Sequence, residues 1–157
     1  MKYLIELQKV KDKKAIYYTL GCKLNFSETS TIGRMLQEAG FRTARRGEQA
    51  DICVVNTCSV TEQADKKCRQ AIHRLVRQHP DAFVVVTGCY AQLKPYEIAK
   101  IDGVDIVLGN NDKGDLYKRV VELSARGNAQ VYSCDCEQIT RFFAAFSSGD
   151  RTRSFLK

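Results

Sequence analysis

The sequence predicts an α/β domain, built as a doubly wound parallel sheet with helices on both faces. Short β-branched apolar segments alternate with amphipathic helical segments from residue 14 to about residue 118. This alternation is typical of parallel strands joined by helical crossovers. The two most apolar segments are DICVVN at residues 51–56 and AFVVVT at residues 82–87. Continuous apolar runs of this length indicate strands that are buried on both faces of a sheet.

Each element has its own local signal. The expected strands are residues 15–20, 41–43, 51–56, 82–87, 105–108 and 129–133. Four helices are expected: one capped by Asn25 or Ser27 and running to Ala39 before Gly40, one from Thr61 to Pro80, one opening at Pro95, and one over residues 113–126. The small polar residues suit N-caps, the glycine suits a helix C-terminus, and proline suits a first helical turn. Together they predict a flavodoxin-like or Rossmann-like order of elements.

Length and composition place limits on the organisation of the chain. The chain has 157 residues, of which 44% are hydrophobic and 27% charged, as in an ordinary globular domain. We expect residues 1–133 to form one N-terminal domain and residues 134–157 to form a linker. The sequence contains no apolar run long enough to span a bilayer and no signal-peptide pattern. We therefore expect a cytoplasmic protein without a membrane partner, and the net charge of +7 is compatible with binding to nucleic acid.

Three of the seven cysteines occupy equivalent places in the predicted fold. Cys22, Cys58 and Cys89 each come directly or almost directly after a strand, and two of them follow a glycine. The carboxyl ends of parallel strands share one edge of the sheet, where ligands bind. We therefore expect these thiols to converge, although they are 36 and 31 residues apart in the sequence.

Three thiols without an evident fourth ligand favour a particular kind of metal site. A [4Fe–4S] cluster held by three cysteines leaves one iron open, whereas structural zinc sites usually have four protein ligands. The alternative is that such cysteines are only small buried hydrophobes. That interpretation suits Cys53, inside a strand, and Cys68, on the apolar stripe of a helix. Cys134 and Cys136 form a C-x-C pair near the expected linker, for which a metal site is disfavoured because a second pair is missing.

Three motifs resemble the N-terminal domain of the radical-SAM methylthiotransferases. They are TLGCKLNFSET at residues 19–29, VVNTCSVTEQADKKCRQAI at residues 54–72, and VVTGCYAQ at residues 85–92. Each motif contains one of the three cysteines, and the resemblance covers roughly residues 16–123. Within the family, GCKLN resembles the branch that acts on N6-threonylcarbamoyladenosine beside the tRNA anticodon.

The resemblance implies a mechanism and a set of partners. Cys22, Cys58 and Cys89 would bind an auxiliary [4Fe–4S] cluster that delivers sulfur to C2 of the adenine. S-adenosylmethionine would serve twice, as methyl donor and, at a second [4Fe–4S] cluster, as radical source. The implied partners are the tRNA anticodon stem-loop, an electron donor and a sulfur source. The sequence has no C-x-x-x-C-x-x-C motif for the second cluster. We therefore expect a fragment that is inactive alone and lacks the radical-SAM domain. RTRSFLK at residues 151–157 resembles the stretch just before the C-x-x-x-C-x-x-C motif of that domain.

Other functions remain open at the sequence level. The enzyme could act on isopentenyladenosine in tRNA, or the domain could be a flavodoxin-like nucleotide-binding or flavin-binding module. The latter is disfavoured because no glycine-rich phosphate loop occurs. A thiol redox sensor or a zinc protein would use the same cysteines. The basic residues considered for RNA contact are Lys9, Lys11, Lys13, Lys14, Lys66, Lys67 and Arg69.

Overall fold

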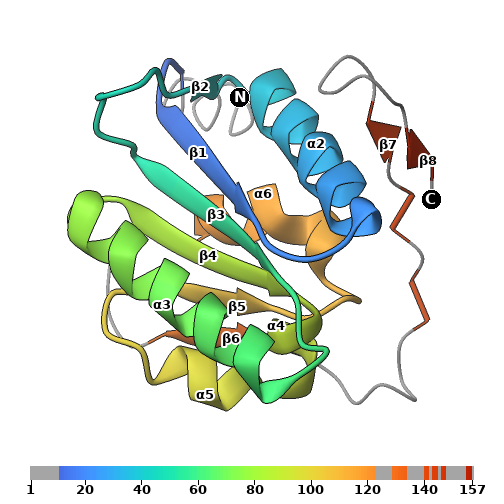
Figure 1. The fold of residues 1–157 in the computed structure, drawn as a ribbon. Helices are drawn as coiled ribbons and strands as arrows, with labels where there is room; N and C mark the ends of the chain where they lie inside the picture. Colours follow the sequence, from blue (N-terminus) through green and yellow to red (C-terminus); the bar gives the residue numbers. More distant parts are fainter. Residues whose placement is uncertain are drawn as a thin grey trace.

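The computed structural model contains the predicted parallel sheet with helices on both faces (Figure 1). It describes residues 11–122, 129–133, 140, 141, 143, 144, 146, 147, 155 and 156. Six strands are hydrogen-bonded in the order β2-β1-β3-β4-β5-β6, and every pair is parallel. The doubly wound fold class expected from the sequence is therefore confirmed.

The strands lie close to the expected segments. They are β1 (Lys14–Thr19), β2 (Arg42–Thr43), β3 (Ile52–Thr57), β4 (Phe83–Gly88), β5 (Ile106–Leu108) and β6 (Gln130–Tyr132). The helices are α2 (Lys23–Glu38), α3 (Glu62–Gln78), α4 (Cys89–Leu93), α5 (Pro95–Ala99), the 3-10 helix η1 (Lys113–Asp115) and α6 (Leu116–Glu122). No helix in the described part of the chain is long and apolar enough to cross a membrane.

Two apolar cores separate the sheet from its helices. Alternate side chains of β3 point to opposite faces, so Cys53 and Val55 pack under α3, while Ile52 and Val54 pack under α2. In Figure 1, α3 and α5 cover one face of the sheet, and α2 and α6 lie on the other. Every residue of β3 is buried, as expected for a strand covered on both faces.

The strand order creates a topological switch point between β1 and β3. After β1 the chain continues into α2 and then to β2, on one side of β1. After β3 it continues into α3 on the opposite face and proceeds to β4, on the other side. Helices that depart in opposite directions leave a crevice outside the strand ends, and doubly wound proteins bind ligands there. Cys22 and Cys58 follow the two strands on either side of this switch point, β1 and β3.

The start of α2 differs from the prediction. The helix begins at Lys23 with Cys22 as its N-cap, so Asn25 and Ser27 lie inside it and are buried. Asn25 does not cap the helix because its amide group donates to the carbonyl oxygens of Leu20 and Thr57. The end of the helix is as expected, since Gly40 has a φ of 106° immediately after the C-cap Ala39.

The remaining boundaries are mostly those expected. Thr61 caps α3 by accepting a hydrogen bond from the Ala64 backbone N–H, and α5 opens at Pro95. The expected helix over residues 113–126 is divided into η1 and α6 and is described only to residue 122. In the tail, β7 (Phe146–Ser147) and β8 (Phe155–Leu156) form a separate antiparallel pair beside α2. The boundary between domain and linker at residues 133 and 134 stays a prediction.

Candidate metal centre

The three predicted cysteines lie at the same edge of the sheet. Cys22 is the N-cap of α2, Cys58 follows the last residue of β3, and Cys89 is the first residue of α4. All three are free thiols; Cys22 and Cys89 are exposed, and Cys58 is half-buried. The fold therefore brings three sulfurs from distant parts of the sequence to the carboxyl ends of neighbouring strands.

Two glycines allow the segment around Cys58 to pass close to its neighbours. A Cβ atom on Gly21 would lie 2.6 Å from the Cβ of Cys58 and 3.1 Å from its sulfur. A Cβ atom on Gly88 would lie 2.3 Å from the Thr57 carbonyl oxygen. Both glycines also have positive φ angles, of 105° and 101°. Only glycine is compatible with this combination of backbone angle and close approach, as expected for the residues before Cys22 and Cys89.

The three thiols interact electrostatically. Burial raises the pKa of the Cys58 thiol, and the neighbouring Cys89 and Cys22 raise it further. Repulsion of this kind requires the sulfurs to be near one another, because the charge of a distant thiolate is screened by solvent. Binding of iron would remove this penalty, since the metal cation stabilises the thiolate form.

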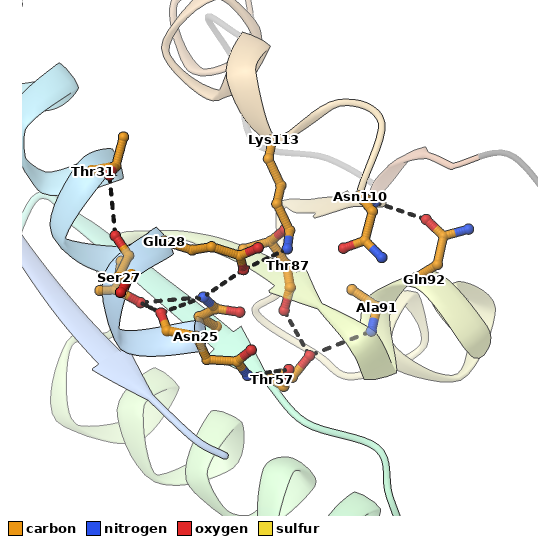
Figure 2. Close-up of polar contacts among 12 residues, drawn as sticks. Asn25, Ser27, Glu28, Thr31, Thr57, Thr87, Ala91, Gln92, Asn110 and Lys113 are labelled. Atoms are coloured by element: carbon orange, nitrogen blue, oxygen red, sulfur yellow. Dashed lines mark hydrogen bonds and ion pairs between the residues drawn. The ribbon is translucent and has the colours of Figure 1, made fainter. Parts of the chain in front are cut away.

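Asn25 connects the segments that carry Cys22 and Cys58. Its Nδ2 donates to the Leu20 carbonyl oxygen at 2.7 Å and to the Thr57 carbonyl oxygen at 3.1 Å. Its Oδ1 lies 3.8 Å from the Cys22 sulfur, which donates to it. Figure 2 shows the Asn25 side chain of α2 pointing toward Thr57. One side chain therefore holds both sides of the crevice.

Thr57 makes the corresponding connection toward Cys89. Its hydroxyl donates to the Thr87 carbonyl oxygen at 2.6 Å and accepts from the Ala91 backbone N–H at 3.4 Å (Figure 2). The residue before Cys58 is thereby bound to the strand before Cys89 and to the helix that Cys89 begins. The Cys68 thiol also donates to the Cys58 carbonyl oxygen at 3.2 Å. This contact of Cys68 was not expected, because its place on the apolar stripe of a helix indicates only a core position.

A buried polar layer lies beneath the cysteines on the α2 face. Lys113 Nζ and Glu28 Oε2 are 2.6 Å apart, and the two side chains are only 4% and 3% exposed. Glu28 also accepts from Asn56 Nδ2 at 3.4 Å, and Asn56 donates to the Asn25 carbonyl oxygen at 3.0 Å. In Figure 2, Lys113 extends from the η1 segment toward Glu28 on α2. No local sequence pattern indicates this ion pair, because its partners are 85 residues apart.

The described residues contain no ready-made site for a single metal ion. Within these ranges, no group of three or more His, Cys, Asp or Glu side chains is arranged to hold one. The three free thiols follow the ends of three neighbouring strands.

Comparison with known sequences identifies the family. The profile of UPF0004, described as an uncharacterized protein family, matches residues 14–109. That range includes all three cysteines and the strands that precede them. The chain belongs to the UPF0004 family.

Curated relatives of this UPF0004 chain are named as tRNA methylthiotransferases. The threonylcarbamoyladenosine tRNA methylthiotransferase MtaB of Bacillus subtilis is 50% identical over 97 residues, covering 62% of this chain and 22% of the relative. The enzyme of that name from Aquifex aeolicus is 37% identical over 146 residues, covering 92% and 36%. A tRNA-2-methylthio-N(6)-dimethylallyladenosine synthase of Sulfurihydrogenibium is 35% identical over 117 residues, covering 72% and 26%. The matches confirm the resemblance to methylthiotransferases, and the chain spans about a quarter to a third of these relatives.

Exposed large hydrophobic side chains occur close in sequence to the three cysteines of the UPF0004 domain. The large hydrophobic side chains exposed in the described residues are Leu24, Val60, Leu93 and Tyr96. Leu24 and Val60 each follow a cysteine by two residues, and Leu93 ends the helix that Cys89 begins. We define these four residues as the apolar rim.

The other cysteines and the basic residues lie in different environments. Cys53 and Cys68 are buried, as expected, whereas Cys134 and Cys136 lie outside the described residues, as does Lys9.

Lys14 begins β1, so the basic group at residues 11–14 lies at the edge opposite the cysteines. Lys66 and Lys67 are exposed on α3, close in sequence to Cys58. Among the basic residues considered for RNA contact, those of α3 are therefore the better placed.

Proposed function

We propose that this chain is the auxiliary-cluster domain of a tRNA methylthiotransferase that modifies N6-threonylcarbamoyladenosine beside the anticodon. In this proposal Cys22, Cys58 and Cys89 are the protein ligands of a [4Fe–4S] cluster. The observation that carries it is the packing of the Cys58 segment between Gly21 and Gly88. This packing gathers three thiols at the ligand-binding edge of a domain whose relatives are named for the same chemistry.

The chain's own residues bind and orient the cluster. The three thiolates would hold the cluster, which would supply the sulfur that is inserted at C2 of the adenine. Asn25 and Thr57 hold the three ligand segments together through hydrogen bonds to backbone groups. The exposed sides of Cys22 and Cys89 leave the centre open toward solvent. The apolar rim provides a surface on which the rest of the enzyme can exclude water from the centre.

The remaining requirements belong to the longer enzyme. They are S-adenosylmethionine, a second [4Fe–4S] cluster in a radical-SAM domain, an electron donor, a sulfur source and the tRNA anticodon stem-loop. In this proposal the second cluster is not supplied by the present residues, which contain no C-x-x-x-C-x-x-C motif. A tRNA substrate accords with the cytoplasmic location expected from the sequence.

A second candidate substrate is supported by one comparison. The relative from Sulfurihydrogenibium is named for dimethylallyladenosine, and its match covers 72% of this chain. The threonylcarbamoyladenosine assignment is preferred because the relatives from Bacillus subtilis and Aquifex aeolicus are named for that substrate. Mass spectrometry of tRNA nucleosides, after reaction of the full-length enzyme with each type of modified tRNA, distinguishes the two. Methylthiolation of the dimethylallyl substrate alone would contradict the preferred assignment.

The cluster itself is tested on the chain described here. Iron and acid-labile sulfide are measured after anaerobic reconstitution of the parent, of a Cys22/Cys58/Cys89 triple-Ala variant and of Cys53→Ala. We expect about four irons and four sulfides per parent chain, a similar content in Cys53→Ala, and none in the triple variant. Equal iron in the parent and the triple variant would exclude these cysteines as ligands.

A further inference from the structure

Asp65 binds the segments that follow two of the three cysteines. It lies in the first turn of α3, where it is 2% exposed. Its Oδ1 accepts from the hydroxyl of Ser59 at 2.6 Å, and Ser59 directly follows Cys58. Its Oδ2 accepts from Lys94 Nζ at 2.9 Å, and Lys94 is the C-cap of the helix that begins at Cys89. One carboxylate therefore connects the Cys58 and Cys89 segments on the α3 side of the crevice.

The energetics of this contact depend on the carboxylate. Burial of the Asp65 carboxyl raises its pKa, but the hydrogen bonds from Ser59 and Lys94 and the nearby charges of Lys94 and Arg69 together outweigh burial, so the pKa lies below its usual value. The Lys94 side chain is 42% exposed, whereas that of Asp65 is 3% exposed. Loss of either donor would leave a buried charge less well compensated, which is strongly unfavourable. The two segments are consequently held at a fixed separation.

This contact complements those of Asn25 and Thr57. Asn25 connects the Cys22 and Cys58 segments on the α2 side, and Thr57 connects β3 to β4 within the sheet. Asp65 acts on the opposite face, in a groove of about 540 Å³ that also contains Glu62 and Lys66. Asp65 also interacts electrostatically with Cys58. On the α3 side the Cys68 thiol also holds the Cys58 carbonyl oxygen, but among the contacts described above only Asp65 connects that side of the Cys58 segment to the Cys89 segment.

We infer that Asp65 is a positioning residue for the three-cysteine centre, because it fixes Cys58 relative to Cys89 through Ser59 and Lys94. The inference rests on the proposed function, in which these cysteines act together as ligands. Cluster ligands must be held within a few tenths of an ångström by the residues around them. Asp65 contributes this restraint without contacting the cluster.

The spacing of the two thiols can be measured without iron. In a Cys22→Ala background, the chain is treated with dibromobimane, a short reagent that joins two neighbouring thiols as each displaces one bromide. Peptide mass spectrometry then gives the ratio of the Cys58–Cys89 cross-link to singly alkylated product. We expect the cross-link to dominate in the parent and the ratio to fall several-fold in Asp65→Asn and in Ser59→Ala.

Matched variants separate positioning from charge and from general stability. Glu62→Gln removes a carboxylate from the same helical turn and the same groove, and we expect it to leave the ratio unchanged. Lys94→Met is expected to lower the ratio, and Lys94→Arg to restore it, because arginine can still donate to Asp65. Protection of buried Cys53 from alkylation verifies that each variant is folded. If Asp65→Asn loses this protection, the positioning role is tested by the cross-link ratios of Ser59→Ala and the two Lys94 variants.

The possible outcomes have distinct meanings. A charge effect alone would make Asp65→Asn more reactive, because removal of a nearby carboxylate favours the Cys58 thiolate. An unchanged or increased cross-link ratio in Asp65→Asn, or an equal loss in Glu62→Gln, overturns the positioning role and leaves the proposed function standing. Absence of the Cys58–Cys89 cross-link in the folded parent would instead contradict the three-cysteine centre, and the positioning role with it.

Discussion

Gly21 controls how closely the segments that carry Cys22 and Cys58 can approach. Its φ of 105° strains any residue with a side chain, and its Cβ would collide with the Cβ of Cys58. Gly47 has a similar φ of 86°, but a Cβ there would meet no atom within 4 Å. The two positions therefore share the same backbone requirement and differ in the close contact.

This difference provides a matched pair of substitutions. We expect both Gly21→Ala and Gly47→Ala to lose about 1–3 kcal/mol of stability from backbone strain. Only Gly21→Ala is also expected to lose most of its iron after reconstitution, because the Cys58 segment must move. Urea denaturation and iron analysis provide the two measurements. Full iron content in Gly21→Ala would show that the close approach is dispensable.

Thiol reactivity should follow the local environment of each cysteine. In the iron-free chain, we expect iodoacetamide to modify exposed Cys22 and Cys89 first and half-buried Cys58 more slowly. Cys53 should remain unmodified until unfolding, since it is buried and burial raises its pKa to about 11. Peptide mass spectrometry over a time course measures this order. Early modification of Cys53 would contradict the burial of β3.

At the scale of single residues, the sequence predicts the positions of some side chains but not their partners. The positions of Cys22, Cys58 and Cys89 could be predicted, because each follows a strong strand signal and parallel strands end at a shared edge. The role of Asn25 could not, since an asparagine near a helix start has a common local use as a cap. Its actual partner, the Thr57 carbonyl oxygen, is known only once β1 and β3 are paired.

At the scale of elements, the buried Lys113–Glu28 pair joins α2 to the segment after β5. Removing one partner of a buried pair leaves an uncompensated charge and costs about 3–5 kcal/mol, whereas an apolar replacement of both is often neutral. We therefore expect Lys113→Met to be strongly destabilised and the double variant Glu28→Leu/Lys113→Met to recover most of the loss. Chemical denaturation of both single variants and the double variant measures this coupling. Additive losses would contradict it.

A second ion pair makes the β2 region sensitive to acid. Glu48 binds the Arg42 guanidinium and the Arg45 backbone N–H, and these bonds lower its pKa from 4.5 to about 2. A carboxylate whose pKa is lower in the folded state adds stability above pH 4.5, and this contribution is lost as the pH falls toward 2. We expect Glu48→Gln to reduce the dependence of the melting temperature on pH over that range. A parallel shift of the whole profile would point to another group.

Element boundaries were predictable where the signal was local. Thr61 and Pro95 fixed the starts of α3 and α5, because a capping hydroxyl and a proline at the first turn act within a few residues. The five-residue helix α4 was not predicted. It is too short to have a hydrophobic period, and it is held through tertiary contacts such as that between Ala91 and Thr57.

For the whole molecule, the cysteines that follow strand ends have a different expected role from those that pack in the core. In a full-length enzyme that carries this domain, we expect alanine at position 22, 58 or 89 to abolish methylthiolation. Reductive cleavage of S-adenosylmethionine should remain largely intact, because it requires only the second cluster. Cys53→Ala is the matched control and should lose stability at most, since Cys53 packs in the core. Liquid chromatography of tRNA nucleosides and of 5′-deoxyadenosine measures the two reactions. Equal loss of methylthiolation in the control would contradict the assignment.

The spacing of the cysteines also determines the order of assembly in the cell. In a zinc finger, neighbouring ligand pairs let the metal bind while the chain is still unfolded and then drive folding. In the proposed centre the ligands come from three strand-to-helix junctions, and these meet only after β1, β3 and β4 have paired. Metal would therefore not nucleate this fold. Iron and sulfide would be delivered to a folded domain, which apolar burial in the two cores sustains until delivery.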